Sequence, residues 1–147
     1  TIGRRQRQMC IRDSIYVGVD NARRVDVGEI IGMARIDLLS NAATSDLPLI
    51  MQIFIEENSK HFIDAFFNRA GPISLKQHAF ELLPGIGNKK AMQMVEQRGS
   101  SGFSDIEQLN ETCNIDSCEL LAKRFVNEIE DKTLQPRLSE LLFPVTA

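Results

Sequence analysis

Residues 74–91 read SLKQHAFELLPGIGNKKA, and this stretch decides the expected fold. Ser74 and Gln77 have the spacing of a capping box, so we expect a helix that begins there and stops at Pro84. Gly85 and Gly87 permit positive φ angles and the close approach of a ligand to bare backbone. The stretch therefore predicts two helices joined by the loop Leu83-Pro84-Gly85-Ile86-Gly87.

The loop and the second helix have the chemistry of an anion site. Ile86 is expected to point into the core, and Ala91 is small enough for close packing of the two helices. The amides that open the second helix lack partners within it, and they favour an anion together with the helix dipole. The candidate binding residues are Gly85, Ile86, Gly87, Asn88, Lys89 and Lys90. Three further cations either extend this phosphate track or are surface charges: Arg69, Lys76 and Arg98.

This pattern resembles the helix-hairpin-helix motif. The motif consists, in order, of an apolar residue, Pro, Gly, an apolar residue, Gly, a basic turn and Ala. The resemblance implies that the hairpin amides hold a phosphate of DNA or RNA without reading the bases, because backbone contacts position but do not specify. The alternative is a protein-interaction module in which the hairpin only braces two helices. Ionic strength separates the two hypotheses, since phosphate binding weakens steeply with salt.

A second hairpin is expected further along the chain. Residues 103–109 resemble the linker helix before such a hairpin, with Ser104 and Glu107 as a capping box, and residues 118–130 would be the closing helix. The turn between them, residues 112–116, has no glycine and ends in an acidic cap, Asp116 with Glu119. An aspartate there repels phosphate, so we predict that this second, degenerate hairpin is structural.

Alternating apolar residues predict strands over residues 15–36, with a turn at Asp20-Asn21. Two or three strands do not make a stable sheet alone, so we interpret them as the remnant of a small barrel.

Helical patterns begin at residue 37. Asp46 is expected to cap a helix that has Pro48 in its first turn. Gly71-Pro72 should end a second helix, and Gly99 should end the helix over residues 88–98.

The first fourteen residues are set apart from the fold. Residues 4–14 resemble a translated sequencing-library adapter, so we expect residues 1–14 to be a disordered artefact. A basic arm that contacts nucleic acid is the alternative. These residues carry a net charge of +3, which leaves −6 on residues 15–147 against −3 for the whole chain. That acidity counts against an extended basic face, so any phosphate contact has to be local.

Catalytic and metal-binding patterns are missing from the sequence, which has no Walker loop, no Ser/His/Asp set and no metal-ligand spacing. Glycosylases that share the hairpin would place a catalytic aspartate near Asp105, but this residue lies in a capping box, and no larger helical domain is present to hold a flipped base. We predict a non-enzymatic protein with no cofactor and no metal ion. Because the apolar runs are far shorter than the roughly 20 residues of a membrane span, we also expect no membrane contact.

Three cysteines are too few and too unevenly spaced for a disulfide framework, which favours a reducing, cytoplasmic compartment. Cys113 and Cys118 are expected to be buried small side chains. His78 is expected to be partly buried, and His61 to lie at the surface where a helix starts.

A wider resemblance covers almost everything after residue 14. It rests on short segments distributed along the chain: Arg35-Ile36-Asp37, Asp46-Leu47-Pro48, Phe66-Phe67-Asn68-Arg69-Ala70, Pro72-Ile73, residues 81–87, Phe103-Ser104-Asp105-Ile106 and Leu141-Leu142-Phe143. These segments are similar to an uncharacterised, mainly archaeal family of predicted nucleic-acid-binding proteins, in which an OB-like barrel precedes a helix-hairpin-helix domain.

The resemblance implies that most of the barrel lies upstream of this chain, where it would offer a surface to single strands or structured RNA. The expected fold is mainly α, with a residual β fragment. Its predicted parts are the artefact at residues 1–14, remnant strands at 15–36, connecting helices at 37–71 and the helix-hairpin-helix domain at 72–147.

Overall fold

The computed structural model describes residues 20–25, 27, 31, 32 and 34–143. The chain divides into two compact units, Thr1–Leu39 and Ser40–Ala147. The prediction for residues 1–14 lies outside the described residues, and so does that for residues 15–19.

The described part of the first unit contains two short 3-10 helices, η1 (Asn21–Arg23) and η2 (Ile36–Leu38), and no strand. Among the residues predicted as strand, Val25 is 67% exposed and Ile31 is 98% exposed. The strand prediction is therefore wrong for the described residues between 20 and 36. Alternation alone does not make a strand, because a pleated segment needs a neighbour to pair its backbone and cover its apolar face.

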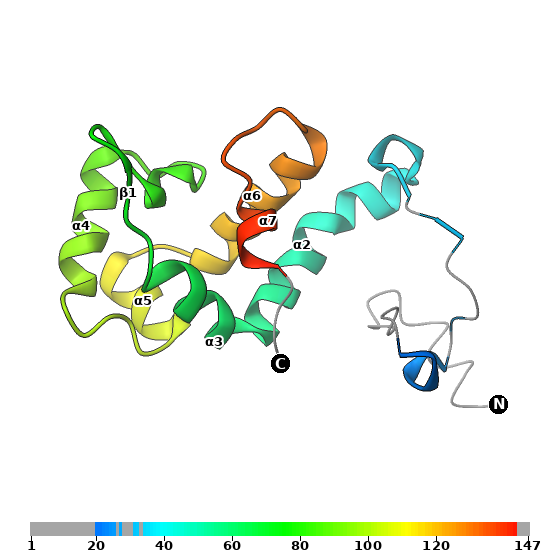
Figure 1. Ribbon diagram of the computed structural model, residues 1–147, viewed down its shortest axis with the longest axis horizontal. Helices are drawn as coiled ribbons and strands as arrows, with labels where there is room; N and C mark the ends of the chain where they lie inside the picture. Colours follow the sequence, from blue (N-terminus) through cyan, green and yellow to red (C-terminus); the bar gives the residue numbers. More distant parts are fainter. Residues whose placement is uncertain (1–19, 26, 28–30, 33, 144–147) are drawn as a thin grey trace. The chain divides into compact units, whose positions relative to one another are not determined.

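The second unit is mainly helical (Figure 1). Its elements in chain order are α2 (Asn41–Glu57), α3 (Ser59–Phe62), a π-helical turn η3 (Ile63–Phe67), β1 (Pro72–Ser74), β2 (Gln77–His78), the 3-10 helix η4 (Ala79–Leu82), α4 (Asn88–Arg98), α5 (Ile106–Cys113), α6 (Ser117–Glu130) and α7 (Leu138–Leu142). The most extensive packing between elements is that of α2 along α6. In the part of the chain that the structure describes, no helix has the length and apolar character needed to cross a membrane.

Helix α2 begins earlier than predicted. Its cap is Ser40, whose Oγ accepts the amide of Ala43 at 3.1 Å, and not Asp46. Pro48 consequently lies inside the helix rather than in its first turn. The helix continues through Pro48 with the loss of one amide donor.

The predicted helix over residues 74–83 is wrong. Strands β1 and β2 pair antiparallel, and a hydroxyl closes the turn between them, since Ser74 Oγ accepts the amide of Lys76 at 3.3 Å. A capping box does follow, one turn later: His78 Nδ1 accepts the amide of Phe80 at 3.1 Å, and the Glu81 carboxylate accepts the amide of His78 at 2.7 Å. Only one 3-10 turn, η4, therefore precedes the loop.

The remaining helix ends are close to those predicted. Gly99 ends α4, with φ 53°, and Asp116 caps α6 by accepting the amide of Glu119 at 3.1 Å. The cap of α5 is Asp105, which accepts the amide of Gln108 at 2.8 Å, and not Ser104. The glutamine reaches back to the Ser104 amide at 2.7 Å, so the expected box is shifted by one residue.

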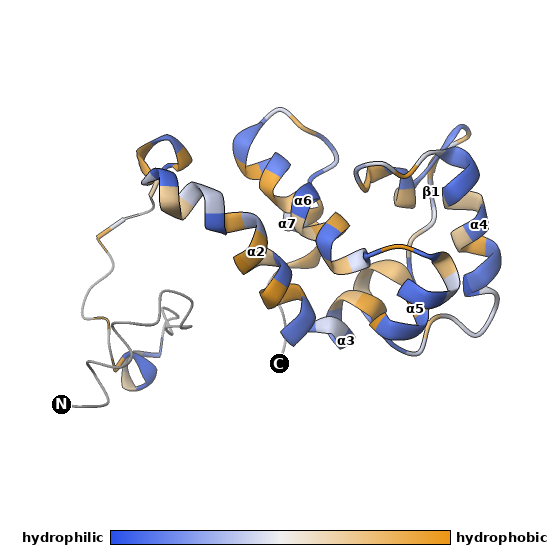
Figure 2. Ribbon diagram, turned by 180° about the vertical axis from the view of Figure 1, so that it is seen from behind, coloured by the Kyte–Doolittle hydropathy of each residue, from blue (hydrophilic) through white to orange (hydrophobic). Residues whose placement is uncertain are grey.

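Phenylalanine rings dominate the core of the second unit. Phe67 stacks on Phe80 with ring centroids 6.2 Å apart, and Phe62 lies 6.0 Å from Phe125. Figure 2 shows hydrophobic residues along much of α2 and hydrophilic ones over most of α4. The fully buried side chains of helix α4 form a narrow stripe, Ala91 and Met94, with Lys90, Val95 and Arg98 half-buried beside it and the other residues exposed.

Candidate functional site

The loop Leu83–Gly87 is held by two apolar anchors. Ile86 is 8% exposed, so its predicted position in the core is confirmed, and Leu83 is 1% exposed. The amide of Ile86 donates to the Leu83 carbonyl at 3.1 Å and closes a tight turn. Gly85 has φ 81°, a conformation that side chains disfavour, so glycine is favoured at this position.

The N-terminus of α4 is open. Gly87 is its N-cap residue, with φ −92° and ψ 178°, so it does not use the positive φ that glycine permits. A Cβ atom at this position would meet nothing within 4 Å. Among the described residues, no side chain caps this helix end, and the first hydrogen bond within the helix is Ala91 N–H to Gly87 O at 2.9 Å. The amides of Asn88, Lys89 and Lys90 precede it.

The two lysines of the first turn have different surroundings. Lys89 is exposed, and no hydrogen bond or ion pair joins it to another described residue. Lys90 is half-buried, and its ammonium group donates to the Cys113 carbonyl at the end of α5. The structure therefore leaves one of the two predicted cations available to a ligand and uses the other to connect two helices.

A groove of about 420 Å³ lies between this loop and the turn before α6. Its lining combines apolar side chains with charges of both signs: Pro84, Gly85, Ile86, Lys90, Ile115, Asp116, Glu119 and Leu120. The acidic side chains belong to α6 and its cap, and the lysine belongs to α4. The groove is thus shared by the two turns that the sequence predicts as hairpins.

The second turn differs from the first in its backbone and its caps. Asn114 takes the left-handed conformation, with φ 51° and ψ 56°, in place of a glycine. Asp116 accepts the amide of Glu119, and Asn110 Oδ1 accepts both the amide and the hydroxyl of Ser117, at 2.9 and 2.6 Å. Side chains of this protein already occupy amides in the first turn of α6.

The three cations predicted to extend the site differ in their burial and in their hydrogen bonds. Arg98 is half-buried and donates to the carbonyls of Phe67 and Ala70 at 3.1 and 2.6 Å, with its guanidinium 5.5 Å from the centre of the Phe80 ring. It therefore stabilises the end of the π-helical turn. Arg69 and Lys76 are exposed, Lys76 in the turn between β1 and β2.

The histidines, and the cysteines at positions 113 and 118, are buried or half-buried side chains of the folded unit. His78 is 6% exposed, and burial, together with the charge of Arg98, lowers its pKa below the usual 6.5. His61 is half-buried rather than at the surface, and its Nε2 lies 2.8 Å from the Leu142 carbonyl. Cys113 and Cys118 are buried as predicted, and burial raises the pKa of Cys118 to about 11. In the described ranges no group of His, Cys, Asp and Glu side chains could hold a metal ion.

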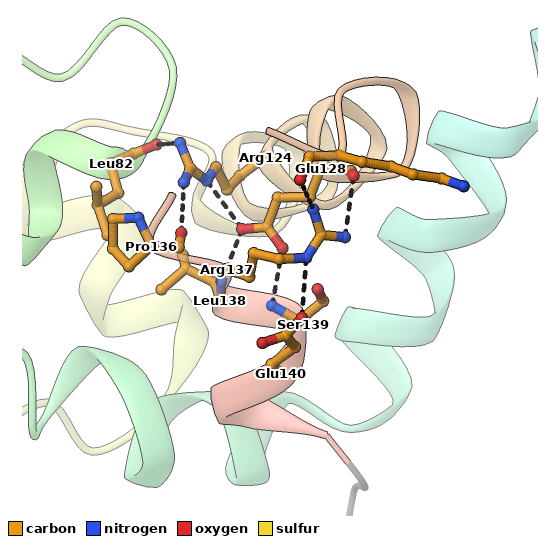
Figure 3. A network of polar contacts seen from close by, with 9 residues as sticks. Leu82, Arg124, Glu128, Pro136, Arg137, Leu138, Ser139 and Glu140 are labelled. Carbon is orange, nitrogen blue, oxygen red and sulfur yellow. Dashed lines mark hydrogen bonds and ion pairs between the residues drawn. The ribbon is translucent and has the colours of Figure 1, made fainter. Parts of the chain in front are cut away.

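Sequence reasoning offered a pairing of Arg124 with a nearby acid but did not predict that this ion pair is buried behind the site (Figure 3). Arg124 and Glu128 on α6 are joined at 3.0 Å, with side chains 8% and 0% exposed. Arg124 also donates to the carbonyl of Leu82, directly before the loop, at 3.5 Å, and to that of Pro136 at 2.7 Å. The spacing of four residues between the arginine and the glutamate was the available signal, but it is equally typical of exposed pairs.

Glu128 acts as a cap for another helix. Its two carboxylate oxygens accept the amides of Leu138 and Ser139 at 2.7 and 2.9 Å, which opens α7. Burial opposes ionisation, but these bonds and that from Arg124 outweigh it and hold the pKa of Glu128 below its usual range. Arg137 donates to the Glu128 carbonyl at 3.1 Å and completes the network.

A family model described as "Protein of unknown function (DUF655)" matches residues 1–138. The chain belongs to this family. Among curated proteins, the uncharacterized protein MJ0038 of Methanocaldococcus jannaschii is 25% identical over 119 residues, which are 81% of this chain and 54% of that protein. The crystal structure of Af1531 from Archaeoglobus fulgidus, described under the same family name, DUF655, superposes with a TM-score of 0.65 and 28% identity. That match covers 71% of this chain and 58% of the other.

The resemblance to an uncharacterised family with archaeal members is thereby confirmed. The chain spans little more than half the length of either relative.

Proposed function

We propose that the chain binds a backbone phosphate of DNA or RNA at the loop Leu83–Gly87 and the first turn of α4, without reading bases. The loop, with η4 before it and α4 after it, is then a helix-hairpin-helix whose first helix is reduced to one 3-10 turn. The observation that supports this function is the open N-terminus of α4, where Gly87 supplies no capping side chain and leaves space above the amides.

The electrostatics of the loop favour a single local contact. The N-terminus of a helix carries about half a positive charge, and Lys89 adds a full charge beside it. The net charge of −6 on residues 15–147 supplies no general attraction to nucleic acid. We therefore expect weak, strongly salt-dependent binding, with a dissociation constant of roughly 10⁻⁴ to 10⁻⁶ M.

The variant Gly87→Asp tests this function without depending on a loss of folding. Aspartate is a preferred N-cap residue, and its Cβ has free space, so α4 should be as stable as before or slightly more stable. Its carboxylate would occupy the amides that a phosphate needs. We expect fluorescence anisotropy with labelled DNA and RNA to show binding by the parent chain and none by Gly87→Asp, with melting temperatures equal or higher in the variant.

Two controls make this measurement specific. All variants are also made with Arg4, Arg5, Arg7 and Arg12 replaced by glutamine, so that a basic N-terminus cannot carry the binding. Lys89→Glu is compared with Lys60→Glu, which makes the same charge change at another exposed lysine. Binding that survives Gly87→Asp, or that both lysine variants weaken equally, would exclude the loop as the phosphate site.

The groove favours one other function, that of a protein-interaction module. Its apolar lining, Pro84, Ile86, Ile115 and Leu120, and the structural use of Lys90 are typical of a packing surface. In this case nucleic acid binding is absent, and Gly87→Asp changes nothing but the stability of α4.

A further inference from the structure

The loop before α4 and the N-terminus of α6 border the same groove, and the starts of the two helices differ in their capping. The N-terminal end of α4 follows Gly87, and no side chain in the part of the chain that the structure describes caps it. The end of α6 is closed, because Asp116 and Asn110 accept the amides of Glu119 and Ser117. Among the described residues, the amides in the first turn of α4 beside the groove therefore have no capping side chain, whereas two amides in the first turn of α6 are already occupied.

The net charges of α4 and of the segment that follows it are also opposite in sign. Residues 88–98 contain two lysines, one arginine and one glutamate. Residues 99–122 contain five acidic residues and no lysine, arginine or histidine. These are Asp105, Glu107, Glu111, Asp116 and Glu119, of which the first four are exposed and the last is half-buried.

Residues 99–122, here called the acidic segment, lie close to the N-terminus of α4. Helix α5 packs against α4, and both Asp116 and Glu119 line the groove together with Gly85 and Lys90. In a duplex, the phosphates of the second strand lie about 6 to 12 Å across a groove from those of the first. Charges interact over about 8 Å at physiological ionic strength, so carboxylates at the second turn would repel that second strand.

We infer that the site accepts one strand of nucleic acid and rejects a continuous duplex. This inference rests on the proposed function of the loop Leu83–Gly87, and it names the substrate class of that site. A single strand places one phosphate on the amides of α4 and directs the rest of its backbone away from the acidic segment, whereas the second strand of a duplex cannot be directed away independently.

The test uses the full 147-residue chain and labelled oligonucleotides of one sequence, single-stranded and annealed, as DNA and as RNA. We expect the single strand to bind at least about tenfold tighter than the duplex at low salt, since a like charge at this range weakens binding by this order. The variant Asp116→Asn/Glu119→Gln keeps a capping side chain on α6 and removes both charges from the groove. It should raise duplex affinity at least about threefold and leave single-strand affinity less changed.

A matched variant, Glu57→Gln/Asp64→Asn, removes two exposed charges that do not line the groove, and it should leave the ratio of the two affinities unchanged. Duplex binding as tight as single-strand binding would overturn the inference, and if Gly87→Asp abolishes that binding, the proposed function stands. Absence of binding to every oligonucleotide would overturn both. Equal shifts in the groove variant and the matched variant would also overturn the inference, because net charge alone would explain them.

Discussion

Lys90, in the first turn of α4, donates its ammonium group to the carbonyl of Cys113, the last residue of α5. The cation thereby satisfies one of the carbonyls that have no partner within α5, at the negative end of that helix. Its neighbour Lys89 lies exposed on the same turn without such a partner among the described residues. Adjacent residues of one type thus have separate roles, one in connecting the two helices and one available to a ligand.

The variants Lys90→Met and Lys89→Met separate these roles. Lys90→Met should lower the free energy of unfolding by about 1 kcal/mol, the size of a charge at a helix end, and Lys89→Met should change it by less than about 0.5 kcal/mol. Lys89→Met should instead reduce the slope of log K against log salt by about 0.7 to 0.9. Urea unfolding and anisotropy titrations measure the two quantities. Equal losses of stability in both variants would contradict the assignment.

His78 should make the stability of the second unit depend on pH. Its folded-state pKa lies below 6.5, so on acidification the unfolded chain takes up the proton first. Its contribution to stability is complete above about pH 6.5 and is lost as the pH falls from there towards the folded-state pKa. Protonation of Nδ1 would also remove the acceptor for the Phe80 amide.

The variant His78→Asn retains a capping side chain that does not titrate. The difference in urea midpoint between the parent and this variant should therefore change between pH 7.5 and 5.5 and be constant above pH 7. A difference that stays constant over the whole range would show that His78 does not titrate differently on folding.

Glu128 should be the most costly acidic side chain to neutralise. It is fully buried, bonded to Arg124 and to two amides of α7, so Glu128→Gln should cost about 3 kcal/mol of the free energy of unfolding. Glu119→Gln breaks the half-exposed pair with Lys123 and should cost less than about 0.5 kcal/mol. Chemical denaturation of both variants at pH 7 gives the comparison. Similar costs would mean that the buried network contributes no more than a surface pair.

Glu128 should also make the free energy of unfolding depend on pH in the acidic range. Since its folded-state pKa lies below the usual 4.5, the stability it contributes is present above that pH. This contribution is lost as the pH falls through the folded-state value. The parent chain and Glu128→Gln should therefore converge in stability in strong acid, as followed by circular dichroism.

Gly102 should tolerate alanine less well than Gly85 does. Both have positive φ, 77° and 81°, but a Cβ at Gly102 would lie 2.8 Å from Asn68 Oδ1, and one at Gly85 would meet nothing within 4 Å. Asn68 exchanges two hydrogen bonds with Phe103, at 2.7 and 3.0 Å, and the clash would break them.

Gly85→Ala should therefore cost about 1 kcal/mol from backbone strain alone, and Gly102→Ala about 2 to 3 kcal/mol. Thermal unfolding of the two variants measures the difference. A smaller loss at Gly102 would mean that Asn68 moves aside without losing its bonds.

Local patterns predicted the elements that depend on neighbouring residues. The bounds of α4, its end at Gly99 and the Asp116 cap follow from capping chemistry within a few residues. The same rules were wrong at residues 74–83, because Ser74 offers its hydroxyl equally to a helix cap or to a tight turn. Pairing of β1 with β2, and the use of His78 as a cap, decided between them.

The sequence by itself determined the glycine turn and the open start of α4, because both depend on the backbone preferences of residues next to one another. It also predicted the burial of Ile86 from its place between two glycines. Only the tertiary structure decided which cation stays available. Lys90 and Arg98 are held by carbonyls 23 to 31 residues away, and Lys89 has no such neighbour among the described residues. The physical reason is that a long cationic side chain bonds to whichever unpaired carbonyls lie within its reach, and folding alone brings those carbonyls there.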